Sequence, residues 1–138
     1  MADHGPVVLL AEDDDELRRL LARKLRRCGC DVIEARTGTQ LVELAVEHTV
    51  EPLPPGERGA ALVISDVRMP GHTGLEVLCL LRRADVEVPI ILMTAFGDAA
   101  IHAEAELRGA TAIFDKPVEL DELAAMSCQL MGIAHPGA

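Results

Sequence analysis

Aromatic side chains are almost absent from this sequence of 138 residues. It has no tryptophan, no tyrosine and only two phenylalanines, Phe96 and Phe114. Stacking of nucleic-acid bases on aromatic rings is therefore not expected. Because 49% of the residues are still hydrophobic, the core has to be built from Leu, Val, Ile, Ala and Met. The length suits one domain of ordinary size.

Positive charge is also scarce. There are 13 Lys and Arg residues against 23 Asp and Glu residues, a net charge of −10 at pH 7. This excess repels phosphate backbones and anionic membranes, so we expect no direct binding of nucleic acid and no membrane contact. Five of the acids form one uninterrupted run at residues 12–16, and without them the count is 18 against 13, or −5. Half of the acidic excess lies in one short segment.

Long hydrophobic runs and paired cysteines are missing as well. No run reaches the roughly 18 apolar residues that span a bilayer, and the first residues lack the basic segment of a signal peptide. The four cysteines show neither C-x-x-C spacing nor a histidine at the distance typical of a zinc site. We therefore expect a cytoplasmic protein with free, buried thiols.

Short apolar runs alternate with segments of helical period. Solid apolar runs predict buried strands at residues 7–10, 31–35, 61–65, 89–93 and 111–114. Leucine and alanine at spacings of three and four predict helices at residues 16–28, 37–49, 73–84, 98–108 and 119–131. This alternation is typical of a doubly wound α/β fold, a five-stranded parallel sheet with helices on both faces.

Polar residues follow four of the predicted strands. Glu12 and Asp13 come after the first strand, Asp66 after the third, Thr94 after the fourth and Lys116 after the fifth. Sites in open α/β sheets form at the carboxyl ends of the strands, where the strand order reverses. In a flavodoxin-like sheet of order 2-1-3-4-5, all five residues would share one pocket.

Three carboxylates in one pocket require positive charge. Two unit charges about 5 Å apart repel by roughly 3 kcal/mol at an effective dielectric constant of about 20. Lys116 supplies one positive charge, and Mg²⁺, which binds carboxylates, water and phosphate oxygens, would supply the rest. Mn²⁺ is the expected substitute. A one-residue shift, with Asp13 and Asp14 as the metal-binding pair, is the alternative.

An ionised aspartate beside a cation is a competent nucleophile toward phosphorus. Asp66 stands alone at its strand end, whereas Glu12 and Asp13 form a pair, so Asp66 is the predicted acceptor. Thr94 would donate its hydroxyl to one phosphoryl oxygen, and Lys116 would pair with another.

Four stretches of the sequence resemble the receiver domain of two-component response regulators. They are residues 9–14 (LLAEDD), 63–71 (VISDVRMPG), 92–95 (LMTA) and 115–117 (DKP). They occur in the order of that family, and the resemblance runs from about residue 7 to residue 131. We therefore expect one receiver domain at residues 7–131, an N-terminal tail at 1–6 and a C-terminal tail at 132–138.

The resemblance implies a signalling switch rather than a metabolic enzyme. A histidine kinase or histidine phosphotransfer protein would present a phosphohistidine, and the domain would catalyse its own phosphorylation at Asp66 and its slow dephosphorylation. Glu12, Asp13, Asp66 and the backbone carbonyl of Arg68 would hold Mg²⁺.

The resemblance also implies how the signal leaves the site. Thr94 would move toward the phosphoryl group, and the change would reach a face formed by the fourth helix, fifth strand and fifth helix. An unknown downstream protein would bind there, and the domain would be a monomer or weak dimer. The Lys116-Pro117 bond is expected to be cis, as in the family.

Three positions depart from the family pattern or vary within it. An aromatic residue often lies three positions before the lysine, and this chain has Ile113 there. Phe114 follows it and should point to the other side of the strand. Arg68 and Phe96 lie two residues beyond Asp66 and Thr94, at positions that border the phosphoryl group. We expect both to shield it from water and so to tune its lifetime.

Several alternatives stay open at this point. The first predicted helix carries six of the 13 basic residues, which fit a solvated face or a kinase-docking surface equally well. A haloacid dehalogenase-like phosphatase needs a second aspartate where this chain has Arg68. A nucleotide or flavin binder needs a glycine- or hydroxyl-rich loop after the first strand. A receiver that only binds partners, and a receiver excised from a longer regulator, are the remaining alternatives.

Overall fold

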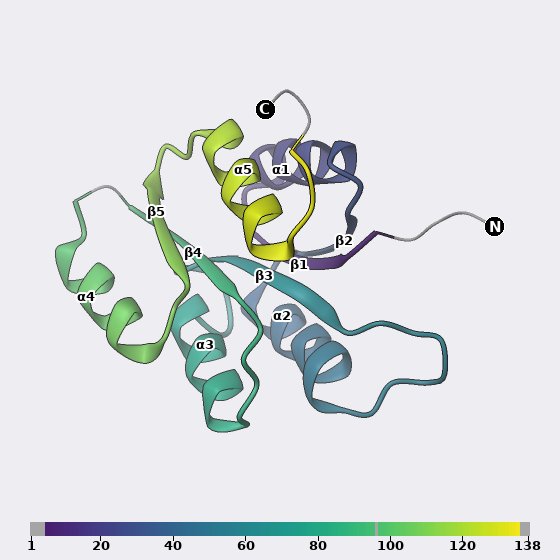
Figure 1. Cartoon of the computed structure of the whole chain (residues 1–138). Helices are drawn as coiled ribbons and strands as arrows, with labels where there is room; N and C mark the ends of the chain where they lie inside the picture. The colour runs from purple at the N-terminus through teal and green to yellow at the C-terminus, as the bar shows by residue number, and fades with distance from the viewer. Residues whose placement is uncertain (1–4, 96, 136–138) are drawn as a thin grey trace.

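The sheet has the predicted order and direction. The computed structural model describes residues 5–95 and 97–135. Five strands pair in parallel in the order β2-β1-β3-β4-β5, as Figure 1 shows. They are β1 (Val7–Ala11), β2 (Asp31–Ala35), β3 (Ala60–Asp66), β4 (Ile90–Ala95) and β5 (Ala112–Lys116). The predicted doubly wound, flavodoxin-like α/β fold is confirmed.

Helices cover both faces of the sheet. α1 (Asp15–Arg27) and α5 (Leu120–Met131) lie on one face, and α2 (Gly38–Ala45), α3 (Gly74–Arg83) and α4 (Ala99–Arg108) lie on the other (Figure 1). Successive strand residues point to opposite faces, so a solid apolar run supplies both layers. Leu9 packs in the core under α2 and α3, whereas its neighbour Leu10 packs under α1 and α5.

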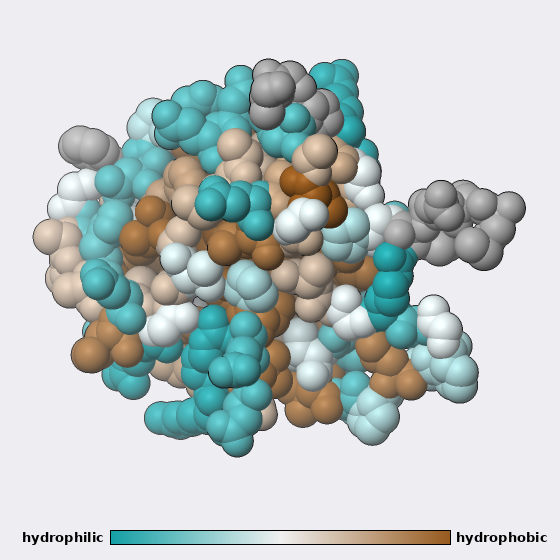
Figure 2. All heavy atoms as spheres, viewed as in Figure 1, coloured by the Kyte–Doolittle hydropathy of each residue, from teal (hydrophilic) through white to brown (hydrophobic). Residues whose placement is uncertain are grey.

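The visible surface is mixed in polarity. Hydrophilic residues lie mainly along the upper and lower margins of the view in Figure 2, and hydrophobic residues gather toward its middle. Among the described residues, no helix has the length and hydrophobicity needed to cross a bilayer. The four cysteines are free thiols, as expected, but only Cys30 and Cys128 are buried; Cys28 and Cys79 are half-buried.

The second predicted helix is shorter than expected and ends in a different geometry. α2 stops at Ala45, and Val46–Val50 form one π-helical turn, η1, in which the Glu51 N–H donates to the Val46 carbonyl (2.9 Å). The Thr49 hydroxyl donates to the Ala45 carbonyl, which competes with the regular α-helical pattern. Pro52 then favours an extended backbone at Glu51, and the helix ends.

The strands extend further toward the site than the sequence predicts. β1, β4 and β5 run one or two residues past the expected ends, and β3 includes Asp66. Parallel pairing continues to Asp66 opposite Met93 and to Ala95 opposite Lys116. Asp66, Thr94 and Lys116 therefore belong to the strands, whose backbone hydrogen bonds fix their positions.

Candidate functional site

The predicted site residues meet at the carboxyl edge of the sheet. Asp66 is the last residue of β3, Thr94 is the penultimate residue of β4, and Lys116 is the last residue of β5. Glu12 and Asp13 directly follow β1. β1 and β3 are neighbours at the centre of the sheet, where the strand order reverses, so these ends form a crevice.

An acidic cluster occupies this crevice. Carboxylate oxygens of Glu12, Asp13 and Asp66 lie within 4.8 Å of one another. Glu12 is 0% exposed and Asp66 is 6% exposed, whereas Asp13 is open to solvent. At these separations each ionised pair repels by roughly 3 kcal/mol at an effective dielectric constant of about 20. The cluster therefore needs compensating positive charge.

Lys116 provides part of that charge. Its Nζ donates to Glu12 Oε1 at 2.7 Å and also to Asp66 Oδ2. Burial disfavours the charged ammonium, but the hydrogen bonds to Asp66 and Glu12 outweigh it and raise the pKa of Lys116. Burial raises the pKa of Glu12 to about 7, even though Lys116 and the Asp14 N–H both donate to its carboxylate.

The remaining polar groups fit a hard cation and a tetrahedral anion. The cluster offers only oxygen ligands, which Mg²⁺ prefers, and the exposed Asp13 leaves one side open for water and phosphate. Thr94 is 1% exposed, and its Oγ1 has no hydrogen-bond partner among the residues that the structure describes. A buried hydroxyl without a partner is uncommon and fits a donor that serves an incoming group.

Beside the cluster lies a hollow of about 510 Å³. It is lined by Asp66, Arg68, Ala95, Lys116 and Pro117. The Arg68 N–H donates to Asp66 Oδ1 at 3.2 Å, and its guanidinium reaches into solvent. The Lys116-Pro117 peptide bond is cis, as predicted. Phe96, the other residue expected to border the phosphoryl group, lies outside the described residues.

Comparison with known proteins identifies the family. A family model described as the response regulator receiver domain matches residues 8–127. The chain belongs to this family. Receiver domains are phosphoacceptor switches of two-component systems and generally bind Mg²⁺, which agrees with an acidic cluster that could hold a metal ion.

Individual relatives agree with this assignment. The chain is 34% identical to the uncharacterized transcriptional regulatory protein YkoG of Bacillus subtilis, over 86% of this chain and 47% of YkoG. It is 27% identical to sporulation initiation phosphotransferase F of the same species, over 84% of this chain and 86% of the relative. The Francisella response regulator 1452 receiver domain shares the fold, with a TM-score of 0.79 and 23% identity over 93% of this chain and 98% of that one.

The matched proteins differ in length. The chain spans 47% of YkoG and about a quarter, 23% and 24%, of two further transcriptional regulators that it matches.

The acidic run at residues 12–16 contributes both to the acidic cluster and to the start of α1. Asp14 is the N-cap of α1, where its side chain accepts hydrogen bonds from the Glu16 and Leu17 N–H groups. Asp13, and not Asp14, lies with Glu12 and Asp66. The geometry therefore favours Glu12 and Asp13 over the shifted pair.

Ile113 and Phe114 face opposite sides of β5, as the sequence predicts. Ile113 packs against the core under α2 and α3, and Phe114 packs on the opposite face with the core under α1 and α5. Phe114 is therefore on the wrong side of the sheet to replace an aromatic residue at position 113.

The contacts of two polar side chains, Arg18 and His102, were not predicted. Arg18 is buried, donates to the Glu12 carbonyl at 3.0 Å and to Glu34 at 3.1 Å, and so holds the segment after β1. Its spacing from Leu21 and Leu25 places it on the buried side of the helix, a signal that was available in the sequence. His102 and Asp115 lie 2.6 Å apart and join α4 to β5, and no local pattern indicates this pair.

Proposed function

We propose that Asp66 is the phosphoryl acceptor of this receiver domain. The observation that carries the proposal is the convergence of Asp66 with Lys116, the acidic pair and the unpartnered Thr94 hydroxyl in one crevice. Asp66 is more accessible to an incoming group than Glu12, because Asp66 lines the open hollow and Glu12 is fully enclosed.

The donor is a phosphohistidine on a histidine kinase or histidine phosphotransfer protein. A carboxylate oxygen of Asp66 attacks phosphorus, and the bond between phosphorus and the imidazole nitrogen breaks. The imidazole leaves with the electron pair of that bond and takes up a proton, so the products are an aspartyl phosphate and a neutral histidine. In dephosphorylation, water attacks phosphorus, the bond between phosphorus and the Asp66 oxygen breaks, and inorganic phosphate leaves as Asp66 regains its carboxylate.

The other residues of the crevice offset the negative charge of the phosphoryl oxygens, either directly or through Mg²⁺. Glu12, Asp13, Asp66 and the backbone carbonyl of Arg68 are the proposed ligands of Mg²⁺, which when bound offsets the negative charge of the phosphoryl oxygens. Lys116 keeps its ammonium beside Asp66, ready to pair with a phosphoryl oxygen. Thr94 donates its hydroxyl to another oxygen and so gains the partner that it lacks. The domain thereby assists its own phosphorylation and dephosphorylation.

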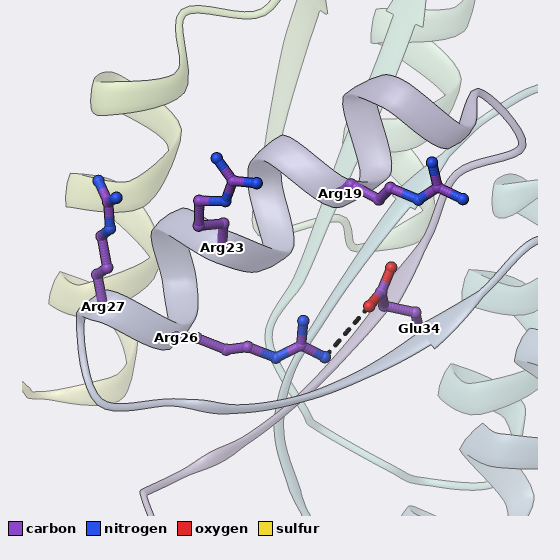
Figure 3. A pocket seen from close by; sticks show the side chains of 5 residues that line it. All are labelled: Arg19, Arg23, Arg26, Arg27 and Glu34. Atoms are coloured by element: carbon purple, nitrogen blue, oxygen red, sulfur yellow. Dashed lines mark hydrogen bonds and ion pairs between the residues drawn. The ribbon is translucent and has the colours of Figure 1, made fainter.

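A basic face on α1 is the proposed docking surface for the donor. Arg19, Arg23 and Arg27 follow one another at four-residue spacing along the exposed side of the helix (Figure 3). Within the described residues none of the three has an ion pair or hydrogen bond, whereas neighbouring Arg26 pairs with Glu34 at 3.2 Å. Like charges at this spacing repel one another, and an acidic helix of the partner would relieve the repulsion.

The proposed output surface is formed by α4, β5 and α5. The His102–Asp115 contact already couples α4 to the strand that carries Lys116. A displacement at Lys116 or Thr94 would therefore reach α4 through the backbone of β5. The downstream protein binds this surface according to the phosphorylation state.

The test is phosphorylation by a small donor such as phosphoramidate with Mg²⁺, followed by intact mass spectrometry. The parent should gain one phosphoryl group, and the gain should disappear with EDTA and in Asp66→Asn. Asp115→Asn is the matched control, because it removes an aspartate at the same end of the sheet that faces α4. An equal gain in Asp66→Asn would refute the assignment.

A further inference from the structure

Arg68, which lines the hollow beside the acidic cluster, forms an ion pair with Asp98. Arg68, in the segment between β3 and α3, places its Nη2 3.9 Å from Oδ2 of Asp98, which precedes α4. The Arg68 side chain is 76% exposed and that of Asp98 is 25% exposed. Exposed pairs of this kind are weak and exchange partners readily.

Asp98 makes two interactions with its two carboxylate oxygens. Oδ1 accepts a hydrogen bond from the Ile101 N–H at 3.2 Å and so caps the start of α4. Oδ2 faces Arg68. One carboxylate therefore connects the wall of the hollow to the first turn of α4.

We propose that the Arg68 guanidinium binds the phosphoryl group on Asp66. Before phosphorylation, Asp98 binds this guanidinium instead. This inference rests on the proposed phosphorylation of Asp66. Arg68 lines the same hollow as Asp66, and its own N–H already donates to the Asp66 carboxylate. A phosphoryl group carries close to two negative charges against one on Asp98, and it offers the guanidinium several acceptor oxygens.

When the Arg68 side chain leaves Asp98 and binds the phosphoryl group, two consequences follow. The phosphoryl group gains a charged hydrogen-bond donor that also limits the approach of water. Asp98 keeps its cap on α4 but loses its tether to the segment after β3, so the state of Asp66 reaches α4 directly. This route does not need an aromatic side chain at position 113, where the chain has isoleucine.

The proposal predicts that Asp98 competes with the phosphoryl group for Arg68. Asp98→Asn removes the competing charge and keeps the α4 cap, because asparagine caps helices as well as aspartate does. The rate of phosphorylation by phosphoramidate should rise about two- to five-fold, the factor that corresponds to one exposed ion pair. In an Arg68→Gln background, Asp98→Asn should not change the rate. In an Arg68→Lys background, Asp98→Asn should again raise the rate, by a smaller factor than in the parent.

The experiment measures phosphorylation rates of the parent, both single variants and the double variant, with saturating Mg²⁺ and intact mass as the readout. Circular dichroism confirms that each variant is folded. Equal effects of Asp98→Asn in both backgrounds, or no effect in either, would overturn the role of Arg68 while leaving Asp66 as acceptor. If the parent gains no phosphoryl group, or Asp66→Asn gains one equally, the proposed function itself fails.

Discussion

Replacement of Lys116 by methionine should destabilise the Mg²⁺-free protein. The Lys116 ammonium contacts the carboxylates of Glu12 and Asp66, both of which are buried. Removal of one member of a buried ion pair costs about 3–5 kcal/mol. Lys116 is itself 29% exposed and Glu12 can take up a proton, so we expect the free energy of unfolding to fall by about 2–3 kcal/mol at pH 8. Methionine keeps the aliphatic stem, which isolates the effect of the charge.

The loss should depend on pH in a defined direction. Burial raises the pKa of Glu12 to about 7 in the folded protein, above the ordinary value of 4.5. A carboxyl group with a raised pKa favours folding at low pH, and this contribution is lost as the pH rises from about 4.5 through 7. At pH 5.5 Glu12 is protonated in the folded variant, so the absence of the Lys116 ammonium leaves only the Asp66 carboxylate without a positive partner. The difference between parent and variant should therefore grow from pH 5.5 to pH 8.

Urea unfolding measures the free energy of unfolding of the parent and the variant. Far-ultraviolet circular dichroism is the readout, because the chain has no tryptophan for fluorescence. Lys24→Met is the matched control: Lys24 pairs with Asp121, which is 69% exposed, so its loss should stay below about 1 kcal/mol and be insensitive to Mg²⁺. Mg²⁺ should restore part of the stability of Lys116→Met. If the two variants differ by less than about 0.5 kcal/mol at pH 8 without Mg²⁺, the assigned charge balance is wrong.

Three further substitutions test the fold and the docking surface. Arg82→Met should lower the free energy of unfolding by about 2–3 kcal/mol, because one guanidinium donates four hydrogen bonds to three backbone carbonyls. The exposed neighbour Arg83→Met should change it by less than about 0.5 kcal/mol in the same urea assay, and similar losses would contradict this. Thr73→Ala removes the capping box of α3 and should cost about 1 kcal/mol, with Glu76→Gln retaining most of the stability. Arg23→Glu should slow phosphoryl transfer from a cognate donor protein about ten-fold at low salt and leave the phosphoramidate rate unchanged, whereas a slower phosphoramidate reaction would point to damage in the crevice.

The fold was predictable because its main signal is local. Solid apolar runs such as Ile90–Met93 indicate strands that are buried on both faces, and the alternation with helical segments leaves few topologies. The π-helical turn after α2 was not predictable, since Val46–Val50 continue the helical composition. Its geometry depends on the Thr49 hydroxyl and on the proline that follows Glu51, two effects that compete without changing the hydrophobic period.

The position of a site residue was predictable only where it depends on the backbone alone. Asp66 ends β3 and Lys116 ends β5, two parallel strands with only β4 between them, so strand order brings both residues to the same edge of the sheet. The Arg68–Asp98 and His102–Asp115 pairs depend instead on side-chain directions in segments that are distant in sequence, and residue type carries no such information.

The acidic run shows the same distinction within five consecutive residues. Glu12 is fully buried beside Lys116, Asp13 joins the cluster from the solvent side, and Asp14 caps α1. Asp15 pairs with Arg18 and Arg36 instead. Identical chemistry thus acquires different roles because the chain changes from strand to helix within the run. The net charge of −10 therefore predicts repulsion of nucleic acid, but the charge that matters for phosphorylation is fixed by where β1 ends.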